Sequence, residues 1–113
     1  MLNFSNWNDL KETVLRKGVT RKAFTGEGAT IALNYFTPGH EPKPHSHIYE
    51  QIVYIIKGKA KFHVGNEEVI LDEGGLLVIP PNIEHYLEAI GDENVLNLDV
   101  FTPKREEYVN IDS

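Results

Sequence analysis

The chain has 113 residues, of which 41% are hydrophobic and 25% charged, and its formal net charge is −6 at pH 7. This length and composition predict a single globular domain over residues 1–113. The negative charge argues against nucleic-acid binding, which needs clustered Lys and Arg. It leaves an anionic small molecule open as a substrate, because a bound metal ion and one arginine can reverse the local field. The absence of cysteine excludes disulfides and thiol chemistry.

The N-terminal segment, residues 1–17, shows no targeting signal, since its start lacks a basic region followed by an apolar stretch. No apolar run in the chain approaches membrane-spanning length, so we expect a cytoplasmic protein without a membrane partner. Leu2, Phe4 and Trp7 pack either on the domain's own core or on a second subunit. A homodimer is expected, because a chain of this size supplies only a modest core.

Short β-type runs separated by turn residues follow a short helix that is expected within Asn8–Lys17. Gly65-Asn66 is a two-residue hairpin turn, and Pro80-Pro81 ends a strand because proline cannot donate to a ladder. Regularly spaced short strands are typical of an all-β antiparallel sandwich or barrel. The polar tail, residues 104–113, is either loose or covers the barrel. The predicted strands are Thr30–Thr37, Ile52–Lys57, Lys59–Val64, Glu67–Leu71, Leu76–Ile79, His85–Ile90 and Val95–Thr102.

Two histidines two residues apart indicate a metal site. An extended strand sends every second side chain to the same face, so His45 and His47 can point into one cavity. Gln51 has the same parity and joins them if the strand stays regular, whereas His85 has to arrive from a different strand. Three imidazoles and one amide oxygen suit one divalent transition metal ion, with room for water or substrate. Nickel, zinc, manganese, iron and cobalt all remain open.

The spacing of these residues resembles the two sequence motifs of the cupin superfamily. The resemblance implies a single-domain cupin β-barrel, a jelly roll, over about residues 18–103. Cupins usually have glutamate where this chain has Gln51, and glycine where it has Asn82. An amide in place of a carboxylate removes one negative charge, which makes a bound metal more Lewis acidic. The residues that carry the resemblance are Gly39, His45, His47, Gln51 and Gly58, then Gly74, Pro80 and His85.

Two segments resemble more closely the KdgF-like, pectin-degradation group of cupins, namely His45–Gln51 and Asp99–Tyr108. The resemblance implies metal-dependent opening of a 4,5-unsaturated uronate ring to a linear keto sugar acid. It implies a substrate site lined by Asp99, Phe101 and Arg105. It also implies one divalent metal ion held by His45, His47, Gln51 and His85. The chain departs from the group at Ile48-Tyr49, where Pro-His is common, and this departure bears on the substrate.

The chemistry of the C-terminal residues agrees with that reading. Asp99 and Phe101 share parity with Asn97, so all three can face the metal cavity. A carboxylate beside a metal suits general acid–base catalysis, Arg105 suits a uronate carboxylate, and the ring of Phe101 offers an apolar face to a sugar. Other interpretations stay open: Asp99 as a buried structural acid, Arg105 as a solvated or interface charge, and Phe101 as a core residue.

Three hypotheses of function follow. The leading one is a ring-opening or isomerising enzyme for an unsaturated sugar acid, with Asp99 as the acid–base group. The second is a cupin dioxygenase, which needs a redox-active metal and would consume oxygen. The third is a sugar- or metabolite-binding cupin without turnover. His40 and His63 fall outside the motif spacing, and we expect a loop position for the first and a strand face for the second.

Overall fold

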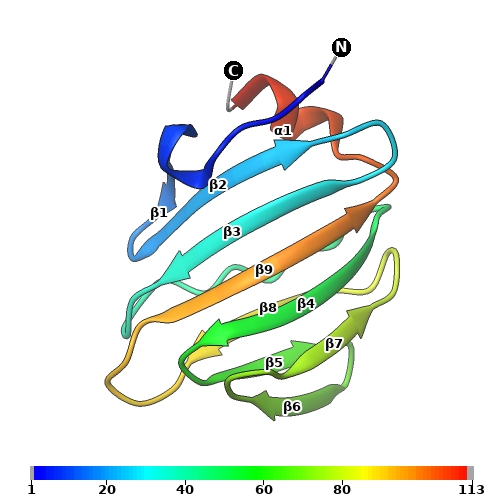
Figure 1. Cartoon of the computed structure of the whole chain (residues 1–113). Coiled ribbons are helices and arrows are strands. Elements are labelled where there is room, and N and C mark those ends of the chain that lie inside the picture. The colour runs from blue at the N-terminus through cyan, green and yellow to red at the C-terminus, as the bar shows by residue number, and fades with distance from the viewer. Residues whose placement is uncertain (1, 112–113) are drawn as a thin grey trace.

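The computed structural model describes residues 2–111 and folds them into two antiparallel β-sheets (Figure 1). The larger sheet has six strands in the order β1-β2-β3-β9-β4-β7, and the smaller has three in the order β6-β5-β8. A 3-10 turn, η1 (Trp7–Asp9), precedes the strands, and a helix, α1 (Glu106–Ile111), follows them. The strands are β1 (Thr13–Arg16), β2 (Val19–Thr25), β3 (Thr30–Phe36), β4 (Glu50–Lys57), β5 (Ala60–Val64), β6 (Glu67–Leu71), β7 (Leu76–Ile79), β8 (His85–Ala89) and β9 (Val95–Thr102).

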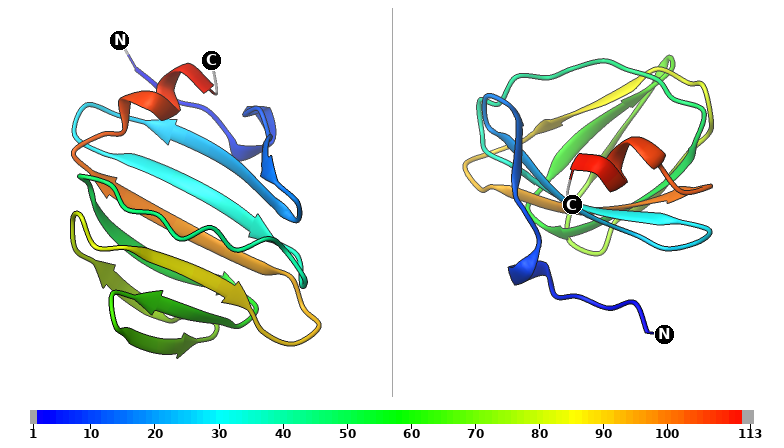
Figure 2. Two further views of the ribbon diagram at one scale, coloured as in Figure 1. Left: turned by 180° about the vertical axis from the view of Figure 1, so that it is seen from behind. Right: turned by 90° about the horizontal axis from the view of Figure 1, so that it is seen from above.

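The two sheets enclose one main hydrophobic core, which confirms the predicted all-β sandwich or barrel. Val53, Ile55, Ile79 and Val95 are no more than 1% exposed and belong to this core. Seen from above, α1 lies across one end of the barrel (Figure 2). The C-terminal tail therefore covers the barrel as far as the structure describes it.

Strand β9 occupies the middle of the larger sheet and pairs with β3 on one side and β4 on the other. Its inward side chains are buried, and two of them, Asn97 and Asp99, are polar. Between these inward residues stand Leu96, Leu98 and Val100, which point outward. The strand therefore turns two polar side chains into the barrel beside the apolar Val95 and Phe101, while the side chains between them that point away are apolar.

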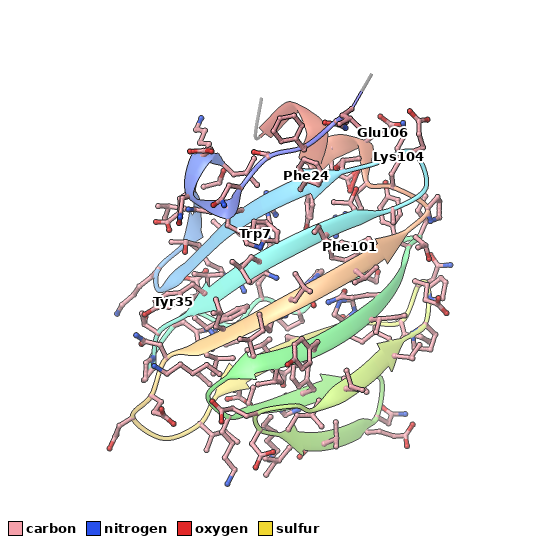
Figure 3. All side chains as sticks on the ribbon, in the orientation of Figure 1. Trp7, Phe24, Tyr35, Phe101, Lys104 and Glu106 are labelled. Atoms are coloured by element: carbon pink, nitrogen blue, oxygen red, sulfur yellow. The ribbon has the colours of Figure 1, made fainter. Side chains whose placement is uncertain are left out.

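The outward side of the larger sheet is apolar across four neighbouring strands, β3, β9, β4 and β7, and we call it the outer face. The register brings these side chains together, since Ile52 pairs with both Val100 and Val78. Tyr35 lies on the same side of the sheet (Figure 3). Trp7 and Phe24 lie there too, towards the edge that β1 and β2 form. The outer face comprises Ile31, Leu33, Tyr35, Ile52, Tyr54, Ile56, Leu76, Val78, Leu96, Leu98 and Val100.

The prediction of a short helix within Asn8–Lys17 is wrong. Helical structure there is limited to the three-residue turn η1, whose cap is Asn6, with its side chain accepting from the Asn8 amide at 2.9 Å. The following residues form β1, which makes a hairpin with β2. Gly18 turns this hairpin with a φ of 76°, a left-handed conformation that glycine adopts freely. Pairing with β2 thus outweighs the weak helical signal of the segment.

The sequence does not predict β2, although the strand pairs with β3 along its whole length. Its inward residues are Val19, Arg21 and Ala23, all of them buried. The charged Arg21 interrupts the apolar alternation by which a half-buried strand is recognised. Its guanidinium carbon lies 3.8 Å from the ring centroid of Tyr108 in α1. A contact between distant segments therefore accommodates a charge that the local pattern presents as exposed.

The N-terminal residues extend away from the barrel (Figure 2). Leu2 and Phe4 are 86% and 82% exposed, so packing of these two on the domain's own core is wrong. Trp7 is half-buried, and its carbonyl oxygen accepts a hydrogen bond from Lys22 Nζ at 2.8 Å. This N-terminal arm, residues 2–7, is therefore fixed to the sheet at Trp7, while the apolar residues before Trp7 are exposed to solvent. No helix within residues 2–111 is long and apolar enough to cross a membrane.

Candidate metal centre

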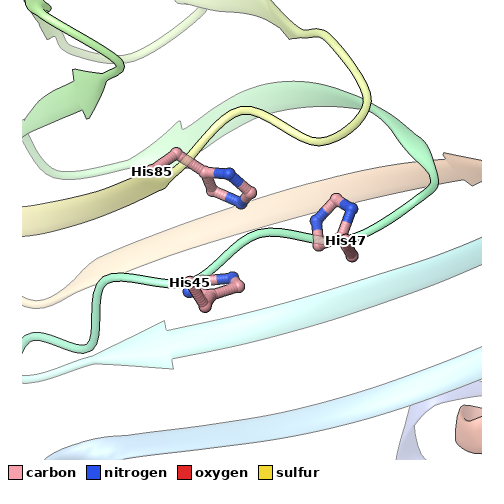
Figure 4. A group of neighbouring side chains, drawn as sticks. All are labelled: His45, His47 and His85. Carbon is pink, nitrogen blue, oxygen red and sulfur yellow. The ribbon is translucent and has the colours of Figure 1, made fainter.

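Three histidines from two segments converge on one point (Figure 4). His45 and His47 come from the connection between β3 and β4, and His85 is the first residue of β8. Each ring offers one ligand nitrogen, and the three nitrogens lie within 4.8 Å of one another. The structure thus brings together the three histidines that the sequence singled out.

Backbone hydrogen bonds hold the two histidine segments against each other. The His45 amide donates to the His85 carbonyl at 3.1 Å, and the His85 amide donates back to the His45 carbonyl at 2.8 Å. The amide of Asn82 donates to the His47 carbonyl at 2.7 Å. Asn82 adopts a φ of 65°, a left-handed conformation that asparagine tolerates better than most residues. The residue that stands where cupins usually have glycine therefore keeps the turn geometry.

Each histidine ring is oriented by a backbone carbonyl group. The Nδ1 atoms lie 2.7 Å from Lys43 O for His45, 3.0 Å from Tyr49 O for His47 and 2.8 Å from Ile83 O for His85. A carbonyl oxygen can only accept, so each Nδ1 carries the proton, and in a neutral ring Nε2 keeps its lone pair. This is the orientation that protein scaffolds give to metal-binding histidines.

The electrostatic surroundings favour neutral imidazoles. Burial disfavours the cation and lowers the pKa of all three histidines, to about 4 for His85. Neutral imidazole is the form that binds a metal. Within the described residues, His85 Nε2 is a buried nitrogen without a hydrogen-bond partner. This orphaned lone pair, together with its two neighbours, fits a divalent metal ion.

Gln51 adds an oxygen to the three nitrogens. It is the inward residue near the start of β4, 7% exposed, and its Oε1 lies 3.0 Å from His47 Nε2. Neither atom has a proton to donate when His47 is neutral with its proton on Nδ1. Two ligands about 2.1 Å from one ion, at right angles, stand about 3.0 Å apart. The contact therefore fits a cation shared by the amide and the imidazole.

Asp99 determines which end of the Gln51 amide faces the histidines. The two side chains point inward from neighbouring strands and hydrogen-bond to each other. An ionised carboxylate can only accept, so the NH₂ group of Gln51 faces Asp99 and its oxygen faces His47. Asp99 also accepts from Asn34 Nδ2 at 2.6 Å and from Asn97 Nδ2 at 2.8 Å. Three amide groups thus surround one buried carboxylate.

The pKa of Asp99 is raised to about 6. Burial disfavours its charged form, and the amide hydrogen bonds of Gln51, Asn97 and Asn34 offset only part of this effect. A carboxyl group with a pKa near the working pH can both take and release a proton. The arrangement is therefore chemically capable of proton transfer next to the candidate metal centre.

Phe101 and Arg105 lie beside the same centre. Phe101 is 2% exposed, and its ring centroid is 5.5 Å from that of His47 in an edge-to-face contact. The guanidinium carbon of Arg105 lies 4.7 Å from the centroid of the Phe101 ring. The backbone amide of Arg105 donates to Thr30 Oγ1 at 2.8 Å, which fixes the start of the C-terminal segment. The inward parity predicted for Asn97, Asp99 and Phe101 is seen in their burial.

The two remaining histidines that the sequence raised lie outside the group. His40 is 8% exposed, packs edge-to-face on Phe36, and its Nε2 accepts from the Ala89 amide at 3.0 Å. His63 stacks on Tyr86 with ring centroids 4.2 Å apart, and its Nε2 lies 2.6 Å from Glu88 Oε1. Both have structural partners, although His40 Nδ1 is a further buried nitrogen without a hydrogen-bond partner within the described residues.

Sequence reasoning missed several neighbours of the centre. Asn34 has the inward parity of β3, and this alternation was the available signal. Sequence reasoning also missed Glu107, whose carboxylate accepts a hydrogen bond from Tyr49, 58 positions earlier in the chain. Tyr108 stacks edge-to-face on Phe101 with centroids 5.6 Å apart. Contacts over such separations depend on the tertiary fold and leave no local pattern.

The chain belongs to the cupin family: a family model described as "Cupin domain" matches residues 33–101. Of the solved structures it resembles, an RmlC-like cupin from Shewanella frigidimarina superposes with a TM-score of 0.84, 21% identity and coverage of 96% of each chain. KdgF from a Halomonas species gives a TM-score of 0.83 and 23% identity, covering 93% of this chain and 98% of that one. No curated protein matches the chain significantly.

A third solved structure shows how widely this fold is used. The polyketide cyclase RemF from Streptomyces resistomycificus superposes with a TM-score of 0.76 and 17% identity, covering 94% of this chain and 82% of that one. These neighbours share the cupin jelly roll, and their names describe different proteins. At such identities the likeness establishes the fold, so the reaction has to be argued from the site itself.

Proposed function

We propose that this cupin is a metal-dependent enzyme that opens the ring of an unsaturated uronate by proton transfer. The observation that carries the proposal is the position of Asp99, a buried carboxyl group with a pKa of about 6 that hydrogen-bonds to Gln51. His45, His47, His85 and Gln51 would hold the divalent metal ion. When bound, the ion would act as a Lewis acid on the substrate's oxygen atoms.

The proposed reaction is an isomerisation in which one proton moves. The hydroxyl on the anomeric carbon, which is the hemiacetal carbon that closes the ring, loses its proton. The bond from that carbon to the ring oxygen breaks. The carbon of the C=C bond that does not bear the ring oxygen gains a proton. Asp99 would carry the proton between these positions, because its carboxyl group is poised between its charged and neutral forms. No oxidant or second substrate is needed.

Arg105 and Phe101 would position the sugar acid. The guanidinium group of Arg105 suits a uronate carboxylate, since its N–H groups match two carboxylate oxygens. Phe101, a buried core residue that contacts both His47 and Arg105, would hold Arg105 in place beside the sugar acid. The resemblance of His45–Gln51 and Asp99–Tyr108 to the KdgF-like group implies the same class of substrate, and the KdgF structure from Halomonas shares the fold.

The test uses the metal-loaded protein with unsaturated galacturonate and follows the loss of the enol-ether absorbance. We expect acceleration over buffer, and we expect Asp99→Asn to abolish it while the bound metal stays stoichiometric. A rate equal to that of buffer would reject the reaction. Oxygen uptake with the same compounds would instead support a dioxygenase, and saturable binding without turnover would support a sugar-binding cupin.

We also propose that the protein is a cytoplasmic homodimer formed through the outer face. Monomeric proteins rarely expose an apolar patch of this extent. The four strands of the outer face, about 4.8 Å apart, present a flat apolar surface that can supply part of the about 800 Å² per partner in a standard interface. The N-terminal arm, with Leu2 and Phe4 exposed, would supply the remaining contact area. The eleven side chains of the outer face carry no charge, so two acidic copies can meet there without repulsion.

A further inference from the structure

One carboxylate of the chain itself occupies the end of the barrel that α1 covers. Tyr49 Oη donates to Glu107 Oε2 at 2.9 Å, and Arg105 Nε donates to Glu107 Oε1 at 2.7 Å. Both oxygens of a single carboxylate are thus held by two donors, one from the start of the β4 region and one from the C-terminal segment. The pair of donors recognises a carboxylate in this structure.

Arg105 is fixed more firmly than the carboxylate that it holds. The guanidinium carbon of Arg105 lies 4.2 Å, 4.7 Å and 5.0 Å from the ring centroids of Tyr108, Phe101 and Tyr49. The side chain of Arg105 is 13% exposed, whereas that of Glu107 is 47% exposed. A half-exposed carboxylate can leave into water, while an arginine enclosed by three aromatic rings keeps its place. Arg105 would therefore keep its position when the carboxylate of Glu107 leaves it.

The same donors lie close to the candidate metal centre. The Tyr49 ring centroid is 5.8 Å from that of His47, and the Phe101 ring contacts both His47 and Arg105. A ligand held by Tyr49 and Arg105 through its carboxylate would have its remaining atoms beside the three histidines. Charge also agrees with a carboxylate: burial acts against the ionised form of Glu107, but the hydrogen bonds from Arg105 and Tyr49 prevail, so its pKa lies below the usual value.

We propose that Tyr49 and Arg105 form a carboxylate-binding subsite that Glu107 fills until an anionic ligand displaces it. The identity of that ligand as a sugar acid rests on the proposed function. Tyr49 is then a specificity-determining residue, at a position where the KdgF-like group commonly has histidine. Glu107 is a built-in competitor that lowers the affinity for the anion.

A different result is expected if the contact of Glu107 with Tyr49 and Arg105 has a purely structural role. If Glu107 only fixes the first turn of α1 to Tyr49 and Arg105, its removal would loosen the helix and would not improve the binding of any ligand. Glu106 offers a matched control, because it lies next to Glu107 in α1, its side chain is 73% exposed, and its ion-pair partner among residues 2–111 is Lys104, at 3.7 Å.

The experiment measures dissociation constants on the metal-loaded, full-length protein by calorimetry. The probes are D-galacturonate and D-galactose, which differ in having a carboxylate or a neutral hydroxymethyl group. We expect Glu107→Gln to tighten galacturonate binding about fivefold, the value of a half-exposed ion pair, and to leave galactose unchanged. Glu106→Gln should change neither. Glu107→Ala, a second variant, should tighten galacturonate binding as well.

The hydroxyl of Tyr49 is tested in the Glu107→Gln background. Adding Tyr49→Phe should weaken galacturonate binding about fivefold and spare galactose, because one donor to the carboxylate is lost. Equal affinities for Glu107→Gln and Glu106→Gln, or a parallel change for galactose, would overturn the subsite. Charge-selective binding without turnover of the unsaturated uronate would leave the subsite standing and reject the ring-opening reaction.

Discussion

The two faces of the larger sheet differ from those of a usual half-buried sheet, because the inner face mixes polar side chains with the apolar core and the outer face is apolar. On β9, Asn97 and Asp99 point into the barrel, while Leu96, Leu98 and Val100 point away from it. A polar interior requires compensation, and the buried carboxylate of Asp99 receives it from surrounding amide groups. The apolar exterior finds no such partner within the described residues of one chain. The inward polar residues of this strand therefore lie beside the candidate metal centre, and its outward residues belong to the apolar face through which we propose that the chain dimerises.

The largest effect is expected where the inner face meets the histidines. His85→Ala removes a nitrogen whose lone pair is buried, and we expect zinc affinity to fall by more than about 100-fold, since even the loss of an indirect partner of a ligand costs 10–100-fold. Calorimetry with a competing chelator measures the change. His63→Ala is the control, because His63 lies on an outward strand face. Equal affinities in the two variants would remove His85 from the metal site.

The outer face is tested by Tyr54→Lys. Tyr54 is 41% exposed in one chain, so the substitution is compatible with folding, but a lysine at the centre of an apolar interface would be desolvated. We expect the dimer dissociation constant to rise about 30-fold or more, as for an interface hot spot. Sedimentation equilibrium measures it. Ile70→Lys, at a 53% exposed position of β6 on the other sheet, should leave association unchanged. A wild-type protein that sediments as a monomer would refute the dimer itself.

Support of the buried carboxylate is tested by Asn34→Ala. The change removes the hydrogen bond of 2.6 Å to Asp99, and one buried acceptor site then loses its donor. We expect a loss of about 1.5 kcal/mol in the free energy of unfolding of the metal-free protein, in the range for an unsatisfied buried group. Urea denaturation measures this loss. Tyr35→Ala, at the next position of β3 with its side chain turning outward, gives the contrasting case for the metal-free chain. Unchanged stability in Asn34→Ala would mean that water replaces the amide at no cost.

The smallest effect is expected from the N-terminal arm. Deletion of residues 2–6 removes Leu2 and Phe4 from the edge of the proposed interface. Because the arm contributes at the rim, the dimer dissociation constant should rise only about fivefold, less than for Tyr54→Lys. Sedimentation equilibrium again decides the result. A chain with Leu2→Gln and Phe4→Gln separates the apolar contact from chain length, and an effect larger than that of Tyr54→Lys would place the main contact in the arm.

Parts of this molecule were accessible from the sequence because their signals are local. The spacing around His45 and His85 predicted the histidine group, and the alternation in β9 predicted which of its residues share a face. Alternation alone does not decide which face is the interior. A strand reading Asn97-Leu98-Asp99-Val100 is equally consistent with leucine and valine inside. Only the motif resemblance placed the polar face toward the metal.

Other parts were inaccessible because they arise from packing. Arg21 is buried under Tyr108, a contact between segments at opposite ends of the chain, and this contact hides β2 from a pattern search. The carboxylate of Glu107 reaches Tyr49 only because α1 folds back over the end of the barrel. The short 3-10 turn in place of a helix likewise reflects the pairing of β1 with β2. In each case a tertiary contact overrides the local preference.

The reciprocal backbone hydrogen bonds between His45 and His85 couple the folding of this region to metal binding. They join the connection between β3 and β4 to the edge of the smaller sheet, and the same two residues offer ligand nitrogens to one ion. An ion bound there would link these two segments. Their association and the binding of the ion would then become a single equilibrium. The slow exchange of two amide hydrogens, those of His45 and His85, would then report how much of the protein carries its metal.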